Sequence, residues 1–132
     1  MKNFNFYMPT QIRFGKGRIN ELKEIIPSYG KKCLIVSRPF NGSLKKLYEK
    51  INKILEDIGV STFVYDGIVP NPTIDGVNEG VKIASENNID FVLGVGGGSV
   101  MDSAKLIAFL KNKDSKINWN EVTKKYNNPF KI

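Results

Sequence analysis

The sequence predicts an α/β domain whose mainly parallel β-sheet is covered by helices on both faces. Short apolar runs alternate along the chain with longer segments in which apolar residues recur every three or four positions, which indicates strands separated by amphipathic helices. The central runs are apolar at nearly every position, as in strands buried on both faces. At 132 residues, 41% of them hydrophobic, the chain suits one compact domain. We therefore expect β-α-β crossovers around a single sheet.

The first element expected is a β-hairpin over residues 4–14, turning near Pro9, because two short strand-like runs flank that proline. Gly15 and Gly17 then interrupt the strand pattern. From Arg18 to about Pro27 the apolar spacing predicts a helix. Its apolar face would consist of Ile19, Leu22, Ile25 and Ile26.

Residues 32–37 form the next apolar run and predict a strand buried on both faces. This run contains Cys33, which is the only cysteine, so an intrachain disulfide is excluded and a buried thiol is expected. A long helix should begin at 41–43 and end near Gly59. Its predicted core-facing stripe comprises Leu44, Leu47, Ile51, Ile54, Leu55 and Ile58.

The second half continues the same alternation. Residues 60–65 predict a strand that runs into a turn-forming segment, and Thr73 is a suitable N-cap for a helix over about 74–87. Residues 91–95 predict a further buried strand, followed at once by three glycines and another helix. We place the folded core at residues 1 to about 112 of one domain, with an irregular or partly helical tail over 113–132.

Gly96, Gly97 and Gly98, together with Ser99, form the strongest candidate site, because they lie between a buried strand and a helix. Glycines allow the backbone to approach a diphosphate closely, and the N–H groups and dipole at a helix N-terminus stabilise negative charge. The spacing matches neither the G-x-G-x-x-G nor the P-loop motif. The alternative is a tight strand-to-helix turn without a ligand.

The neighbouring polar residues have two interpretations each. Ser99 could donate a hydrogen bond to phosphate or cap the helix, and both roles could coexist. Asp102 could contact a cofactor hydroxyl or simply interact with the helix dipole in the first turn.

Composition excludes several other functions. The chain has no histidine, the commonest metal ligand and general base, and no paired carboxylate spacing that would replace it. Its net charge of +7 comes from lysines spread over predicted helix faces, so we expect no nucleic-acid partner. No segment is apolar enough for a membrane span or a secretory signal, which predicts a soluble, cytoplasmic protein without a membrane partner.

The sequence resembles the iron-containing, or group III, alcohol dehydrogenases, a family that includes butanol, propanediol and glycerol dehydrogenases. The resemblance covers nearly the whole chain. It depends on these segments in order: Phe6-Tyr7-Met8-Pro9-Thr10, Phe14-Gly15-Lys16-Gly17, Pro70-Asn71-Pro72-Thr73, and Gly96-Gly97-Gly98-Ser99 followed by Asp102, Ala104 and Lys105.

This resemblance implies a Rossmann-like domain that binds NAD or NADP. Gly97, Gly98, Ser99 and Asp102 would contact the pyrophosphate and the nicotinamide ribose. Asn71 would lie beside the adenosine part of the cofactor, although a turn residue between prolines is an equal interpretation. Arg38, just after the first nucleotide-binding strand, would pair with the 2′-phosphate of NADP or remain a solvated surface residue, so the choice of cofactor stays open.

In the family, iron or zinc is held by a separate, mostly helical C-terminal domain that is not among these 132 residues. The resemblance therefore implies an oxidoreductase that transfers hydride between an alcohol or aldehyde and the nicotinamide. We expect the present chain to bind the cofactor but to be inactive by itself. The alternative is a non-catalytic module that self-associates, for instance as a homodimer, through the face that the second domain would cover.

Overall fold

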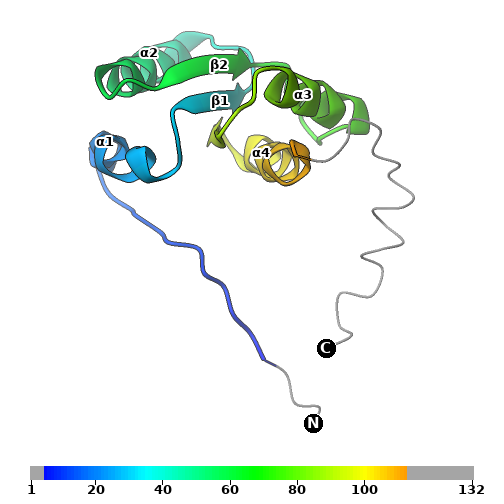
Figure 1. Ribbon diagram of the computed structural model, residues 1–132, viewed down its shortest axis with the longest axis horizontal. Coiled ribbons are helices and arrows are strands. Elements are labelled where there is room, and N and C mark those ends of the chain that lie inside the picture. Colours follow the sequence, from blue (N-terminus) through cyan, green and yellow to red (C-terminus); the bar gives the residue numbers. More distant parts are fainter. Residues whose placement is uncertain (1–4, 113–132) are drawn as a thin grey trace.

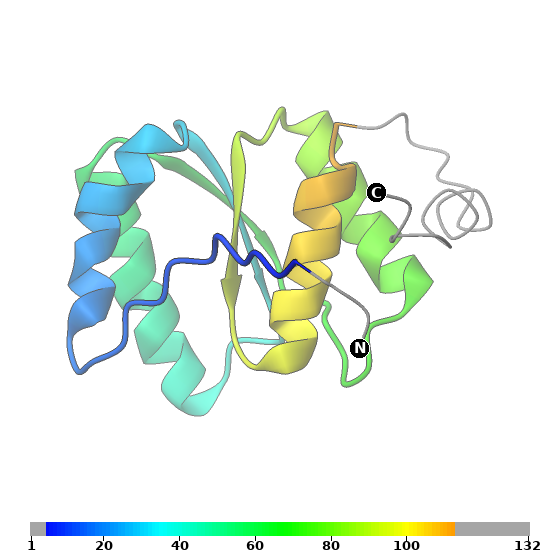
Figure 2. The same cartoon turned by 90° about the horizontal axis from the view of Figure 1, so that it is seen from below.

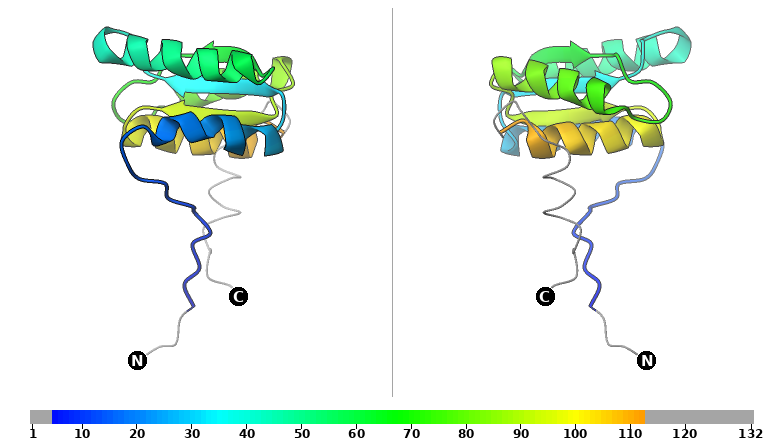
Figure 3. Two further views of the ribbon diagram at one scale, coloured as in Figure 1. Left: turned by 90° about the vertical axis from the view of Figure 1, so that its left-hand side faces the viewer. Right: turned by 90° about the vertical axis from the view of Figure 1, so that its right-hand side faces the viewer.

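The computed structural model describes residues 5–112 and consists of one parallel sheet between two layers of helices (Figures 1 and 3). The predicted tail over 113–132 lies outside the described residues. The strands are β1 (Lys32–Ser37), β2 (Ser61–Tyr65) and β3 (Phe91–Val95). The helices are η1 (Arg18–Glu21), α1 (Leu22–Ile25), η2 (Ile26–Ser28), α2 (Gly42–Asp57), α3 (Ile74–Glu86) and α4 (Gly98–Leu110).

Strand β1 is the centre of the sheet, whose order is β2-β1-β3. It pairs in parallel with both neighbours, and Leu34 lies opposite Phe63 of β2 and Val92 of β3. Every residue from Cys33 to Ser37 is buried, because helices cover both faces of this strand. The predicted two-sided burial is confirmed for this strand. Strand β3, which is also predicted to be buried, is buried only at Val95, because it has a neighbouring strand on one side only in the described sheet.

Figure 2 shows helices on both sides of the sheet, and an apolar core fills the space on each side. One lies between the sheet and helices α3 and α4, and the other between the sheet and helices α1 and α2. Side chains of β1 alternate between them, with Leu34 and Val36 in the first core and Cys33 and Ile35 in the second. This alternation is the two-residue period of a strand.

Local signals set the ends of several helices. Thr73 caps α3 as predicted, because its hydroxyl oxygen accepts a hydrogen bond from the Gly76 N–H at 3.1 Å. Gly59 follows α2 in the left-handed conformation, with φ of 71°, which confirms its expected place at the end of that helix. The predicted helix from Arg18 to Pro27 is divided into the short turns η1, α1 and η2.

The expected hairpin at the N-terminus is wrong for the described residues. Residues 5–14 contain no strand, and the segment runs away from the sheet and helices (Figure 1). Its aromatic side chains are largely exposed, with Tyr7 at 86% and Phe14 at 93%. A two-stranded hairpin is only marginally stable in water unless it packs against another surface, and the described residues offer this segment none.

Among residues 5–112, no helix is long and apolar enough to cross a lipid bilayer.

Candidate functional site

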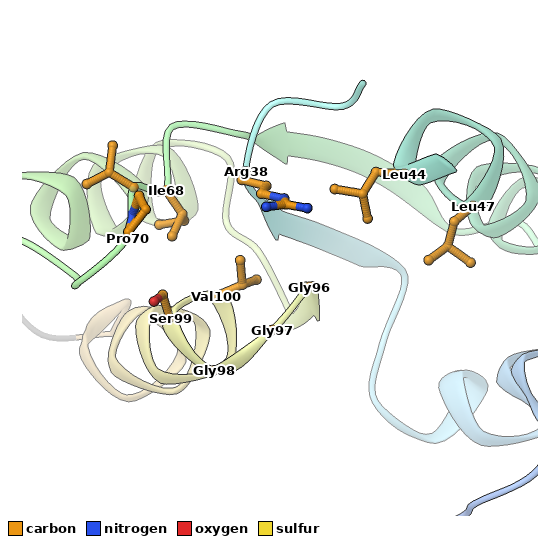
Figure 4. Close-up of a pocket in the computed structure, with 11 residues that line it drawn as sticks. Arg38, Leu44, Leu47, Ile68, Pro70, Gly96, Gly97, Gly98, Ser99 and Val100 are labelled. Atoms are coloured by element: carbon orange, nitrogen blue, oxygen red, sulfur yellow. The ribbon is translucent and has the colours of Figure 1, made fainter. Parts of the chain in front are cut away.

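A cavity of about 500 Å³ lies at the carboxyl edge of the sheet, where the chain segments that follow the three strands come together (Figure 4). Arg38 follows β1, residues 68–70 come shortly after β2, and Gly96 follows β3 directly. Ligands of open parallel sheets bind at this edge, in the crevice where the strand order reverses, which here lies between β1 and β3. The lining residues are Arg38, Leu44, Leu47, Ile68, Val69, Pro70, Gly96, Gly97, Gly98, Ser99 and Val100.

The three consecutive glycines have different structural tasks. None of them has a left-handed φ, so the turn itself does not demand glycine. A Cβ at Gly96 would lie 2.7 Å from Cγ2 of Val100, so glycine is needed there for packing. At Gly97 and Gly98 a Cβ would meet no heavy atom within 4 Å and would enter open space at the cavity. Close packing within the turn therefore explains the glycine at position 96 but not those at positions 97 and 98.

The N-terminus of α4 opens toward the same cavity. Gly97 is the N-cap residue, no side chain caps the helix, and the Met101 N–H donates to the Gly97 carbonyl at 3.0 Å. The N–H groups of Gly98, Ser99 and Val100 consequently have no partner within the helix. Together with the positive end of the helix dipole, they form a site suited to an anion.

The charged side chain in the cavity is positive, like the end of the α4 dipole that opens toward it. Arg38 is the only charged residue among those that line it, and Figure 4 shows its side chain between the segments that carry Ile68 and Leu44. No carboxylate lines the cavity. A negatively charged ligand would therefore meet a guanidinium and the start of a helix without like-charge repulsion.

The predicted site residues divide into two groups. Arg38 and Gly96 to Ser99 line the cavity, whereas Asn71 and Asp102 do not. Asp102 is exposed on α4, where its carboxylate lies 3.6 Å from Nζ of Lys105. Asn71 is exposed with φ of 60°, which agrees with its interpretation as a turn residue.

Of the two interpretations of Ser99, the helix cap is wrong. The helix begins at Gly98, so Ser99 is its second residue and the cap position belongs to Gly97. A serine inside the first turn has helical backbone angles, which do not suit the capping geometry. Its hydroxyl remains at the cavity, since Ser99 is among the lining residues.

Ser37 fixes the relative position of the loops, a role that the sequence did not indicate. Its buried hydroxyl donates to the Val95 carbonyl at 2.9 Å and so joins the carboxyl ends of β1 and β3. Its backbone carbonyl accepts from the Ile68 N–H at 3.2 Å, which attaches the segment after β2. A single residue therefore holds together the segments that surround the cavity.

The apolar side of the cavity was also missed. Leu44 and Leu47 belong to the helical stripe that is predicted to face the core, and their half-buried side chains also line the cavity together with Ile68, Val69 and Pro70. Leu47 packs against the second apolar core as well, as predicted. A signal was present in the sequence, because Ile68-Val69-Pro70 is an apolar stretch within a turn segment. Loops seldom carry such residues unless these residues pack against something.

The described residues do not fit an iron or zinc site. Within residues 5–112 no group of three or more cysteine, aspartate or glutamate side chains is placed to hold a metal ion, and the chain has no histidine. Burial raises the pKa of the Cys33 thiol to about 12, so this thiol stays neutral and is a poor ligand.

Comparisons with known proteins find relatives in both sequence and structure. The model of the iron-containing alcohol dehydrogenase family matches residues 9–131. A probable NADH-dependent butanol dehydrogenase of Bacillus subtilis is 41% identical over 128 residues, which are 96% of this chain and 32% of that protein. The NADPH-dependent aldehyde reductase YqhD of Escherichia coli is 38% identical over 113 residues, which are 85% of this chain and 28% of that protein.

Solved structures show the same fold. An NADH-dependent butanol dehydrogenase of Thermotoga maritima superposes with a TM-score of 0.74 at 38% identity, covering 87% of this chain and 30% of the other. The Escherichia coli aldehyde reductase gives a TM-score of 0.78 at 33% identity, with coverage of 98% and 33%. The present chain thus spans about a third of the length of the proteins that it matches.

Proposed function

Because this chain belongs to the iron-containing alcohol dehydrogenase family, we propose that it binds a nicotinamide dinucleotide in the cavity at the carboxyl edge of its sheet. One observation carries the proposal. Gly97 and Gly98 have backbone conformations that other residues can adopt, and a Cβ at either position would enter open space at the cavity. Glycine at these positions is explained by a ligand that contacts the backbone directly.

The pyrophosphate would lie against the N-terminus of α4. The N–H groups of Gly98, Ser99 and Val100 would donate to its oxygens, and the Ser99 hydroxyl would add a further hydrogen bond. Gly96 would let the loop pack closely enough on Val100 to present these groups. Asp102, which lies beyond the lining residues, could reach only a ribose hydroxyl at the margin of the site.

The adenosine would occupy the apolar side of the cavity, against Leu44, Leu47 and Ile68, and Asn71, which follows the lining residue Pro70 in the chain, would contact it only from outside this lining. Arg38 favours NADPH over NADH, since a guanidinium can bind the 2′-phosphate and the cavity has no carboxylate for a 2′-hydroxyl. The relatives are named for both cofactors, so the residue at this position is the feature that would decide the preference.

A fluorescence titration with NADPH and NADH, on the wild type and on Arg38→Gln, tests both parts of this proposal. One charge-assisted hydrogen bond contributes about 1.5 to 3 kcal/mol, so Arg38→Gln should weaken NADPH binding roughly 10- to 150-fold and change NADH binding little. Lys45→Gln is the matched control, because it removes the same charge from the exposed side of α2.

Two outcomes of that titration would contradict the proposal, one of them the dinucleotide site and the other the cofactor preference. If neither cofactor binds the wild type at millimolar concentration, the dinucleotide site is wrong. If Arg38→Gln weakens both cofactors equally, the site stands and the preference for NADPH is wrong.

The reaction class proposed for the whole enzyme is oxidation of an alcohol or reduction of an aldehyde. The bound cofactor would supply the hydride acceptor or donor, at its nicotinamide ring. The residues of this chain would bind and orient that cofactor. We expect these 132 residues to bind the cofactor but not to oxidise an alcohol by themselves. We also expect the protein to be cytoplasmic.

Self-association is a second proposal, supported by exposed apolar side chains on α4. Met101 is 49% exposed and Leu106 is 37% exposed, and they lie on the helix next to β3, which has a neighbouring strand on one side only in the described sheet. Open strand edges and apolar patches favour association with a second copy. Light scattering over a concentration series should show dimers that Leu106→Glu abolishes, and a strictly monomeric wild type would end this proposal.

A further inference from the structure

Helix α4 contains a buried hydroxyl that has no protein partner. Ser103 is fully buried, and its Oγ forms no hydrogen bond within the described residues. The other fully buried serine, Ser37, donates to the Val95 carbonyl. Burying a hydroxyl without a partner is costly, so native proteins nearly always satisfy such groups with protein atoms or with ordered water.

A small cavity lies beside this hydroxyl, separate from the large one. The space open to the centre of a water molecule is about 10 Å³, close to what one water requires. Its lining residues are Gly67, Ile68, Val69, Pro72, Thr73, Gly76, Val77 and Ser103. They come from the segment after β2, from the start of α3 and from α4.

The lining offers two hydroxyl groups, and a buried water needs two to four polar partners. Besides Ser103, Thr73 contributes a hydroxyl whose oxygen accepts from the Gly76 N–H and whose hydrogen remains available to donate. No lining residue is charged, which argues against an ion, and the volume admits nothing larger than water.

We propose that this cavity is a specific binding site for one ordered water molecule, held by the Ser103 hydroxyl and by the segment 67–73. The water joins that segment to α4. Ile68 and Val69 line both this cavity and the large one, so the water also fixes the apolar side of the larger cavity. The proposal concerns the protein without any cofactor and does not depend on the proposed function.

Replacement of Ser103 by alanine tests the proposal, because the direction in which the melting temperature changes distinguishes a bound water from an unpaired hydroxyl. A hydroxyl that binds a structural water loses a stabilising interaction on removal, so Ser103→Ala should lower the melting temperature by several degrees. A shift of roughly 4 to 8 °C corresponds to about 1 kcal/mol in a domain of this size. A hydroxyl without any partner would do the reverse, because its removal relieves the cost of burial and raises the melting temperature.

The water itself can be counted by magnetic relaxation dispersion of the solvent nuclei, which detects long-lived buried water. Ser103→Ala should lose one such water relative to the wild type. Ser37→Ala is the matched control, because it removes a buried serine hydroxyl that has a protein partner, and it should lower the melting temperature with the water count unchanged.

The proposal requires both results for Ser103→Ala. An unchanged number of long-lived waters would overturn it, and so would a melting temperature that is equal to or higher than that of the wild type.

Discussion

Replacing Gly98 with alanine separates the contribution of the glycine loop to folding from its contribution to binding. Gly98 is the first residue of α4, its φ is not left-handed, and an added Cβ would meet no heavy atom within 4 Å. Alanine loses less conformational entropy than glycine in a helix, so Gly98→Ala should leave the free energy of unfolding unchanged or raise it by about 0.5 kcal/mol.

Binding should respond in the opposite direction. The new methyl group would stand where the pyrophosphate is proposed to approach the N–H groups of α4. Losing one hydrogen bond to a charged group costs about 1.5 to 3 kcal/mol, which corresponds to a roughly 10- to 150-fold weaker affinity for the dinucleotide. Urea unfolding and NADPH fluorescence titration on the same preparations measure both quantities.

Gly96→Ala is the matched comparison, because there the Cβ would lie 2.7 Å from Cγ2 of Val100. Overpacking of this kind costs about 1 to 3 kcal/mol of folding stability. We therefore expect Gly96→Ala to be less stable than the wild type and Gly98→Ala to be at least as stable. If Gly98→Ala binds the dinucleotide as tightly as the wild type does, the reasoning about the loop is refuted.

Three further predictions concern stability and reactivity. Leu34→Ala, in the fully buried central strand, should lower the free energy of unfolding by about 2 to 5 kcal/mol in urea titrations, and a loss below 1 kcal/mol would contradict the described core. The N–H groups of Lys31 and Lys32 donate to the Asp90 carboxylate at 2.7 and 2.9 Å and hold its pKa below the usual value. The stability that these hydrogen bonds contribute is complete above the ordinary carboxyl pKa and is lost as the pH falls through the lowered pKa. Asp90→Asn should therefore make the melting temperature decline less steeply in acid. A decline as steep as that of the wild type would argue against this assignment. Burial raises the pKa of Cys33 to about 12, so a thiol reagent should label it only after unfolding in urea, and rapid labelling of the native protein would show that the strand is accessible.

Much of the fold follows from the sequence because apolar spacing is a local property. The run at residues 32–37 predicts a strand buried on both faces, and the structure places it in the middle of the sheet with helices above and below. The cap at Thr73 and the left-handed Gly59 are equally local, since each depends on a hydrogen bond or a backbone angle within a few residues. The glycine loop was found for the same reason, as three glycines between a strand and a helix.

The tertiary structure decided what depends on distant partners. Residues 5–14 have a strand-like pattern, but a hairpin forms only where another surface covers it, and the described residues provide none. Leu44 and Leu47 carry the periodicity of a buried face, but the sequence does not show that their half-buried side chains also line a cavity.

The glycine loop shows this division within a single segment. The sequence alone determined that a glycine-rich turn joins a strand to a helix, since apolar spacing and glycine are local features. It could not distinguish the task of Gly96 from the tasks of Gly97 and Gly98, or show that Ser37 joins the strand ends and that Ser103 lacks a protein partner. Those distinctions require the positions of Val100, Val95 and the segment after β2, because packing and hydrogen bonding are set by distance in space.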